Sequence, residues 1–107
     1  MWQKSGSDEP LTYEAAQTYI ERLNHDQFAG YDDWRLPTVD ELISLLEPEK
    51  QSNDLYINPI FDATQRWCWS ADKHSSGAAW RVDFVNGDVH WGYLNLYYYV
   101  RCVHSRQ

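Results

Sequence analysis

Apolar side chains recur at helical spacing in two segments of the first half of the chain. The first segment runs from Thr12 to about Asn24, and Thr12 has the position and residue type of an N-cap. The second runs from about Val39 to Leu46 and ends before Pro48, because proline cannot continue a helix. The polar stretch that follows, residues 47–66, is predicted to be an irregular loop.

The start of the second helix has a recognisable cap sequence. Pro37 holds the residue before it in an extended conformation, so the chain has to turn sharply into the helix. Thr38 can cap the helix, and Glu41, three residues on, can return a hydrogen bond to the amide of Thr38. The sequence therefore predicts a capping box at this helix.

From residue 67 onward the pattern is typical of β-strands. We predict four of them, at Trp67–Ser70, Ala79–Val85, Asp88–Tyr93 and Tyr97–His104. The predicted fold class is therefore α+β, with two helices packed on a small twisted antiparallel sheet and long irregular loops.

Asn86-Gly87 favours a two-residue hairpin turn, and that turn sets a register. Counting from the turn gives three facing pairs: Phe84 with Val89, Val82 with Trp91, and Trp80 with Tyr93. These apolar side chains share one face, which we expect to be core, whereas polar side chains share the other, which we expect to be exposed. The polar set is Arg81, Asp83, Asp88 and His90. In this register His90 lies opposite Asp83, where an ion pair could form.

Composition narrows the possible partners. A chain of 107 residues is expected to form one domain, spanning 1–107, and its aromatic content of 16% means that rings supply much of the packing. The net charge of −7 argues against nucleic acid or an anionic membrane surface as a partner. The charge is uneven, −9 over residues 1–62 and +2 over residues 63–107, so an anionic ligand could meet only the second half.

Neither the two cysteines nor the N-terminal residues identify a chemical function. Cys68 and Cys102 lack the spacing of a metal site, and they fit either a disulfide or two buried thiols. No apolar run approaches the ~20 residues of a membrane span. Met1-Trp2-Gln3-Lys4 is not a signal peptide, so an export signal would lie outside this chain.

Several short phrases follow one another in a characteristic order. They are Met1-Trp2-Gln3, Gly30-Tyr31-Asp32-Asp33-Trp34-Arg35-Leu36-Pro37-Thr38 with Glu41-Leu42, Trp69-Ser70, Val82-Asp83-Phe84, and Tyr99-Val100-Arg101-Cys102-Val103. In this order the chain resembles the Lcl C-terminal domain family, named for a bacterial collagen-like adhesin. It is more remotely similar to the formylglycine-generating-enzyme branch of the C-type lectin fold. The resemblance implies a C-type-lectin-like fold in which the entry to the second helix and the last strand fasten together.

The resemblance also bears on the cysteines. Many relatives carry a cysteine in the first helix that could pair with the one in the last strand, but this chain has none there. By the fold of the family, Cys68 is then the only partner within the chain for Cys102, and a disulfide requires Cα atoms within about 7 Å.

The sequence contains candidate residues for three kinds of catalytic or metal site. A cysteine-oxidising enzyme like the formylglycine-generating relatives would need two close, accessible thiols and copper, whereas inert strand cysteines are the simpler interpretation. A calcium site would use Asp26, Asp32 and Asp33, although turn formation explains these acids better. The four histidines share no metal spacing, so no metal or cofactor is predicted.

Residues 88–99 are rich in Tyr, Asn, His and Trp, which give large contact area and hydrogen bonds at small conformational cost. By similarity to lectin-fold proteins, the contact candidates are His90, Tyr93, Asn95 and Tyr97, with Arg81 as an anion clamp. The leading hypothesis is a non-enzymatic, adhesin-like module of a bacterial surface or secreted protein that binds a glycan or a protein. The alternatives are the cysteine-oxidising enzyme and a structural tip that forms a homotrimer.

Overall fold

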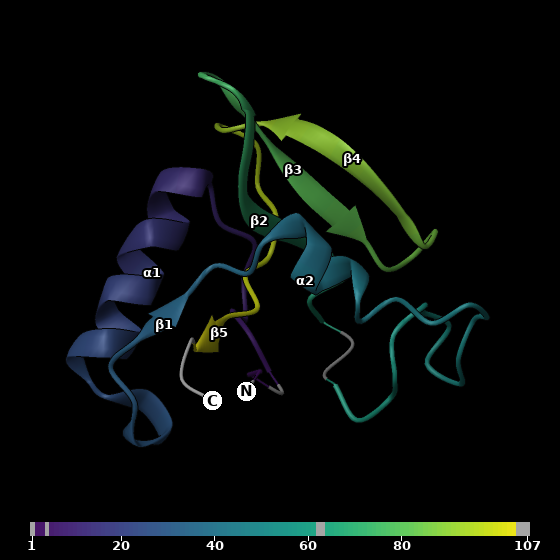
Figure 1. Cartoon of the computed structure of the whole chain (residues 1–107), viewed down its shortest axis with the longest axis horizontal. Coiled ribbons are helices and arrows are strands. Elements are labelled where there is room, and N and C mark those ends of the chain that lie inside the picture. The colour runs from purple at the N-terminus through teal and green to yellow at the C-terminus, as the bar shows by residue number, and fades with distance from the viewer. Residues whose placement is uncertain (1, 4, 62–63, 105–107) are drawn as a thin grey trace.

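The fold is α+β, as predicted, and is seen in a computed structural model that describes residues 2–3, 5–61 and 64–104. Met1, the first residue of the Met-Trp-Gln phrase, lies outside the described residues. The elements in chain order are α1 (Tyr13–His25), the 3₁₀ turn η1 (Phe28–Gly30), β1 (Trp34–Arg35), α2 (Val39–Ile43), β2 (Trp67–Ser75), β3 (Ala78–Asp83), β4 (Asp88–Tyr93) and β5 (Val103–His104) (Figure 1). In the described part of the chain, no helix is long and apolar enough to cross a membrane.

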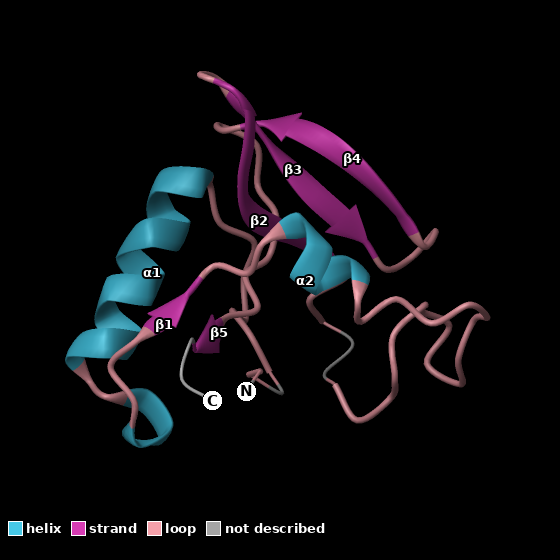
Figure 2. Cartoon of the chain, in the orientation of Figure 1, coloured by secondary structure: helices cyan, strands magenta, loops and turns pink. Residues whose placement is uncertain are grey.

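The strands form two separate antiparallel sheets (Figure 2). The larger sheet has the order β2-β3-β4, and the smaller one pairs β1 with β5. In the smaller sheet Trp34 lies opposite His104 and Arg35 opposite Val103. The segment that leads into α2 is therefore fastened to the last strand, as expected.

Both helix starts agree with the sequence prediction. The Thr12 side chain accepts a hydrogen bond from the Ala15 amide at 3.2 Å and caps α1. At α2, Thr38 accepts from the Glu41 amide while the Glu41 carboxylate accepts from the Thr38 amide at 2.8 Å, which completes the capping box. The carboxylate of Glu41 also accepts from both terminal nitrogens of Arg35, at 2.8 Å each.

The second helix is shorter than predicted, because it ends at Ile43 rather than Leu46. The amides of Leu45 and Leu46 bond carbonyls only three residues back, which tightens the chain into a turn. Leu46 then forms an isolated bridge with Ile57, and this bridge ties the irregular loop to the helix end.

The predicted strand Tyr97–His104 is also wrong over most of its length, since only Val103–His104 forms a strand. The preceding residues bond several different segments in turn instead of one continuous partner. Tyr98 bridges Leu11, Tyr99 bridges Cys68, and the Val100 carbonyl accepts from the Ser7 amide. Such switching of partners prevents a regular ladder, although it ties the end of the chain firmly into the middle of the molecule.

The β3–β4 hairpin has a longer turn than predicted. Its ladder closes at Asp83 opposite Asp88, which leaves four residues in the loop. The Asp83 carboxylate accepts from the amides of Val85 and Asn86, so it organises the loop as an Asx turn. The Phe84 amide bonds the Arg66 carbonyl outside the hairpin, which removes Phe84 from the ladder. Gly87 does adopt a positive φ of 74°, which glycine tolerates.

The predicted register is consequently displaced by two residues, although each side chain keeps its face. The observed pairs are Ala78 with Tyr93, Ala79 with Gly92, Trp80 with Trp91, Arg81 with His90 and Val82 with Val89. Because the side-chain period of a strand is two, a two-residue displacement changes partners without exchanging faces.

The assignment of one buried and one exposed face is wrong, because each face carries core at one end. On one face, Trp69 and Ala79 pack with α1 residues and with Val100 and Cys102 in the first core cluster. On the other face, Val82 and Cys68 pack with Leu42 of α2 in the second cluster. Figure 1 shows α1 and α2 on different sides of β2. The sheet is buried between two cores only part of the way along, and β4 is its open edge.

Candidate functional site

Exposed apolar side chains gather in one short segment. Among the described residues, seven large hydrophobic side chains are strongly exposed, and four of these lie in residues 91–97. The four are Trp91 (42%), Tyr93 (58%), Leu96 (41%) and Tyr97 (66%). This segment covers the end of β4 and the turn after it, at the top of the molecule in Figure 1. Contiguous exposed apolar patches mark binding sites more often than scattered apolar residues do.

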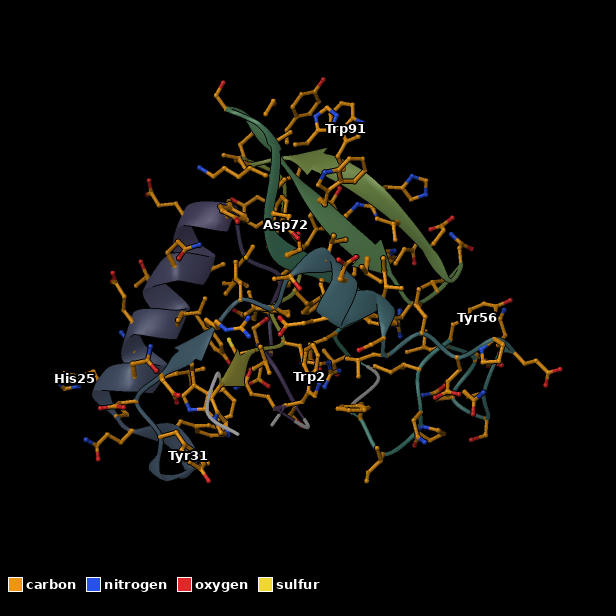
Figure 3. The ribbon with its side chains drawn as sticks, viewed as in Figure 1. Trp2, His25, Tyr31, Tyr56, Asp72 and Trp91 are labelled. Carbon is orange, nitrogen blue, oxygen red and sulfur yellow. The ribbon has the colours of Figure 1, made fainter. Side chains whose placement is uncertain are left out.

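The rings at this end of the sheet contact one another. The imidazole of His74 is stacked on the indole of Trp91, with centroids 4.9 Å apart and 12° between the planes. Trp80 meets His74 edge to face at 5.1 Å, and Tyr93 meets Trp91 edge to face at 5.2 Å. We call His74, Trp80, Trp91 and Tyr93 the aromatic cluster. In Figure 3, Trp91 lies at the top of the sheet, at the opposite end of the molecule from Tyr31.

An irregularity in β2 places His74 in this cluster. The pairing of β2 with β3 shifts between Trp69 and Lys73. Two contacts hold the shifted segment: the Ser70 hydroxyl donates to the Trp80 carbonyl at 2.8 Å, and Asp72 accepts from the Val39 amide at 2.7 Å. Asp72, labelled in Figure 3, therefore connects this part of β2 to the first turn of α2.

The aromatic cluster stays uncovered because α2 reaches only the other end of the same sheet face. Val82 and Val89 share that face with Trp80 and Trp91, and both pack in the second core cluster with Leu42 of α2. The face is therefore buried where α2 covers it and exposed beyond the helix, where the rings lie.

The opposite face carries Arg81, which lies directly across the ladder from His90. The Arg81 guanidinium lies over the Tyr98 ring, 4.8 Å from its centroid. Its Nε and Nη1 atoms are buried and have no hydrogen-bond partner among the described residues. Gly92 makes room for this arrangement, because a Cβ there would lie 2.7 Å from the ring of Tyr98. Buried in this way, those two nitrogens do not face an external ligand.

His90 has a different partner from the one predicted. The expected pair with Asp83 is wrong because the longer turn moves Arg81, not Asp83, opposite His90. The His90 Nε2 atom lies 3.1 Å from Asp88 Oδ1, two residues earlier on the same strand. Both side chains are about half exposed, so this contact is open to solvent.

The other contact candidates lie around the aromatic cluster but on different surfaces. Tyr93 belongs to the cluster itself, on the sheet face opposite to that of Arg81 and His90. Asn95 is exposed and, with Leu94, lines a pocket against Thr12, Tyr13 and Glu14 at the start of α1. Tyr97 is the most exposed of the large apolar side chains in the described residues. The five candidates therefore lie on different surfaces and do not form a single pocket.

The two thiols lie deep in the molecule. Cys68 and Cys102 are free and fully buried, so the disulfide alternative is not realised. Burial raises the pKa of each thiol to about 12, and for Cys102 the nearby Cys68 adds to the increase. A thiol with such a pKa stays protonated at neutral pH, whereas the thiolate is the nucleophile and the metal ligand.

The acids weighed for calcium do not converge in the described residues. No group of three His, Cys, Asp or Glu side chains there is arranged to hold a metal ion. Asp26 contacts His25 at 3.3 Å, whereas Asp33 lies 3.7 Å from the buried His104.

Sequence reasoning missed three members of the aromatic cluster. It put Trp80 and Trp91 on the same face as Tyr93, but it assigned that face to the core. Their number could have revealed their exposure. Three large rings on two paired strands occupy more of a sheet face than one short helix can bury. His74 was missed because the predicted strand Trp67–Ser70 is too short, since β2 continues to Ser75.

The family model described as the Lcl C-terminal domain matches residues 1–104. No curated protein matches the chain.

Proposed function

The chain belongs to the Lcl C-terminal domain family, and from this premise we propose that it is a non-enzymatic, adhesin-like recognition module of a bacterial surface or secreted protein. The proposed ligand is a glycan or a protein on another surface. The proposed binding surface is the open end of the larger sheet, formed by the aromatic cluster and residues 88–98. In the same proposal the α+β fold is of the C-type-lectin-like kind, with its last strand fastened to the entry of α2.

One observation carries the proposal: four of the seven strongly exposed large apolar side chains in the described residues lie within residues 91–97. Exposing Trp91, Tyr93 and Tyr97 forgoes the hydrophobic stabilisation that their burial would give, roughly 1.5–3 kcal/mol for each large side chain. A surface that retains such side chains in one place has the character of a binding site.

The thiols support a non-catalytic role over the cysteine-oxidising alternative. That chemistry needs accessible thiolates, whereas Cys68 and Cys102 are buried with the pKa of each raised to about 12. The two groups are suited to packing, in the way that buried cysteines act as small apolar side chains.

An array of glycans and surface proteins, probed with the chain, tests the proposal. We expect selective capture of at least one ligand, and we expect the double variant Tyr93→Ala with Tyr97→Ala, which removes the two most exposed rings of residues 91–97, to lose that capture while its thermal stability stays nearly unchanged. Phe28→Ala is the matched control, because Phe28 is a similarly exposed ring (45%) in η1, away from the sheet. Failure to capture any ligand, or equal capture by the double variant, would contradict the proposal.

A further inference from the structure

We infer that the aromatic cluster binds a neutral glycan, with a pyranose ring packed against the exposed parts of Trp91 and Tyr93. This inference rests on the proposed recognition role and narrows its ligand class and its site. The face of an aromatic ring is negative, so it attracts the slightly positive C–H groups that line one side of a pyranose. His74 covers one side of the Trp91 indole, and the sugar takes the part of the ring that is left open.

The rings are held in place before any ligand arrives. Trp91 is stacked on the nearly parallel His74 ring, with centroids 4.9 Å apart, and it contacts the Tyr93 ring edge to face at 5.2 Å. Trp80 in turn holds His74, edge to face at 5.1 Å. Side chains fixed in this way lose little conformational freedom on binding, which favours a ligand that makes few contacts.

The charge of this face indicates a neutral sugar rather than a sulfated or phosphorylated one. The β3 and β4 residues on the face of the aromatic cluster are Ala78, Trp80, Val82, Val89, Trp91 and Tyr93, and none of them is charged. Arg81 is on the opposite face, where its guanidinium lies over Tyr98. Lys73 reaches toward the Tyr13 ring of α1, 5.9 Å from the centroid. With a net charge of −7 on the whole chain, β3 and β4 offer an anion no cationic side chain on this face.

The ring spacing argues against a cation as the ligand. A quaternary ammonium group binds inside a cage whose aromatic walls stand apart around it. In the aromatic cluster the ring centroids are 4.9–5.2 Å apart, so the rings fill the space between themselves. A ligand therefore has to lie on the outside of the cluster, as a pyranose does when one of its C–H faces packs on an aromatic ring.

The exposed area argues for a small ligand rather than a protein. A large aromatic side chain contributes about 150–250 Å² when fully covered. With Trp91 42% and Tyr93 58% exposed, the two rings offer on the order of 200 Å² between them. A stable protein interface takes roughly 800 Å² from each partner. One or two sugar units match the smaller area.

Hydroxyl groups next to the rings can bind the polar rim of a sugar. Ser75 pairs with Ala78, and Ala78 pairs with Tyr93, so these three residues form one row across the sheet. The row brings the Ser75 hydroxyl and the phenol of the exposed Tyr93 to the same end of the sheet. Hydroxyls both donate and accept hydrogen bonds, which suits the alternating groups around a pyranose.

Titration of the chain with cellohexaose, maltohexaose, mannohexaose and chitohexaose tests the inference, followed by calorimetry and by the indole N–H signals in NMR spectra. We expect at least one of these to bind and to shift the Trp91 indole signal, which is assigned from its loss in Trp91→Phe. Trp91→Ala should raise the Kd at least about tenfold, or about 1.4 kcal/mol, and Trp91→Phe should raise it less. Phe28→Ala should bind like the parent chain, and heparin should not compete.

Tyr93→Ala provides a second variant with the same expected weakening, in case Trp91→Ala fails to fold by circular dichroism. Three outcomes would overturn the inference: a neutral oligosaccharide whose Kd is unaffected by both variants, an array that captures only proteins or anionic glycans, or self-association of the chain in light scattering that Trp91→Ala abolishes. A captured protein or anionic glycan would leave the proposed recognition role standing. An array that captures nothing would overturn both.

Discussion

The indole of Trp91 and the imidazole of His74 lie nearly parallel, with centroids 4.9 Å apart, although the two residues come from the outer strands of the larger sheet. Trp80 lies on the strand between them and meets His74 edge to face. The stack therefore crosses the whole width of the sheet at its open end. It is the arrangement from which we derive both the binding surface and the kind of ligand.

Removing His74 should loosen Trp91. His74→Ala deletes the ring that covers one side of the indole, and an aromatic pair contributes about 0.5–1.5 kcal/mol beyond its buried area. We expect urea unfolding to show a loss of that order, together with a weaker near-ultraviolet circular dichroism signal from the indoles. An unchanged signal would mean that His74 does not hold Trp91 in solution.

Glu41 should contribute to stability through its cap and its pair with Arg35. Glu41→Ala is expected to cost about 1 kcal/mol, mainly from the lost capping box. The ion pair with Arg35 adds little to this loss, because the two side chains are 38% and 34% exposed and solvent weakens their attraction. Denaturant titration at pH 7 measures the change. A loss below about 0.3 kcal/mol, less than a typical cap, would contradict the role given to the box.

The same residue predicts a pH dependence. Hydrogen bonds from Arg35 and from the Thr38 amide lower the pKa of Glu41 from 4.5 to about 2. A carboxyl group with a depressed folded-state pKa stabilises the fold above its unfolded pKa, and this stabilisation is lost as the pH falls toward the folded value. The stability difference between the parent chain and Glu41→Gln should therefore be full at pH 6 and shrink between pH 4.5 and 2. A difference that stays constant over this range would count against the shift.

Gly92 should be required for the position of Tyr98. A methyl group at this residue would lie 2.7 Å from the Tyr98 ring, so Gly92→Ala has to displace that ring from Trp69 and Arg81. Overpacking of this kind costs typically about 1–3 kcal/mol. Gly77→Ala is the matched control, because a Cβ at Gly77 meets nothing within 4 Å. Equal melting temperatures for the two variants would contradict the close approach.

Both thiols should resist modification in the folded protein. Cys68 and Cys102 are buried, and burial raises the pKa of each to about 12. We expect neither to react with a thiol-specific disulfide reagent at pH 8 until urea unfolds the chain, after which two thiols per molecule should be titrated. Rapid reaction of the native protein would revive the cysteine-oxidising alternative.

Local sequence signals predicted the helix starts and β4 correctly. The Thr12 cap and the Thr38–Glu41 box involve residues no more than three apart, so their geometry follows from the local sequence. The bounds Asp88–Tyr93 also agree with the predicted strand. Local signals failed where a distant residue decides the structure. Phe84 left the hairpin ladder because its amide bonds Arg66, which no spacing in the sequence reveals.

The candidate site was predictable only in part, for the same reason. Alternation correctly put Trp80, Trp91 and Tyr93 on one face of the hairpin. Whether that face is buried depends on the position of α2, whose Leu42 packs with Val82 at the other end of the face and leaves the rings uncovered. The place of His74 depends on the shifted pairing in β2, which is held by the long-range bond between Asp72 and Val39.

Hydroxyl-radical footprinting with and without a ligand captured on the array tests the central claim most directly, because it reports which side chains the ligand covers. We predict that oxidation of Trp91, Tyr93 and Tyr97 falls on binding, whereas oxidation of the exposed ring of Phe28 is unchanged. Protection of Phe28 with no change at residues 91–97 would contradict the claim that this protein recognises its ligand at the open end of the larger sheet.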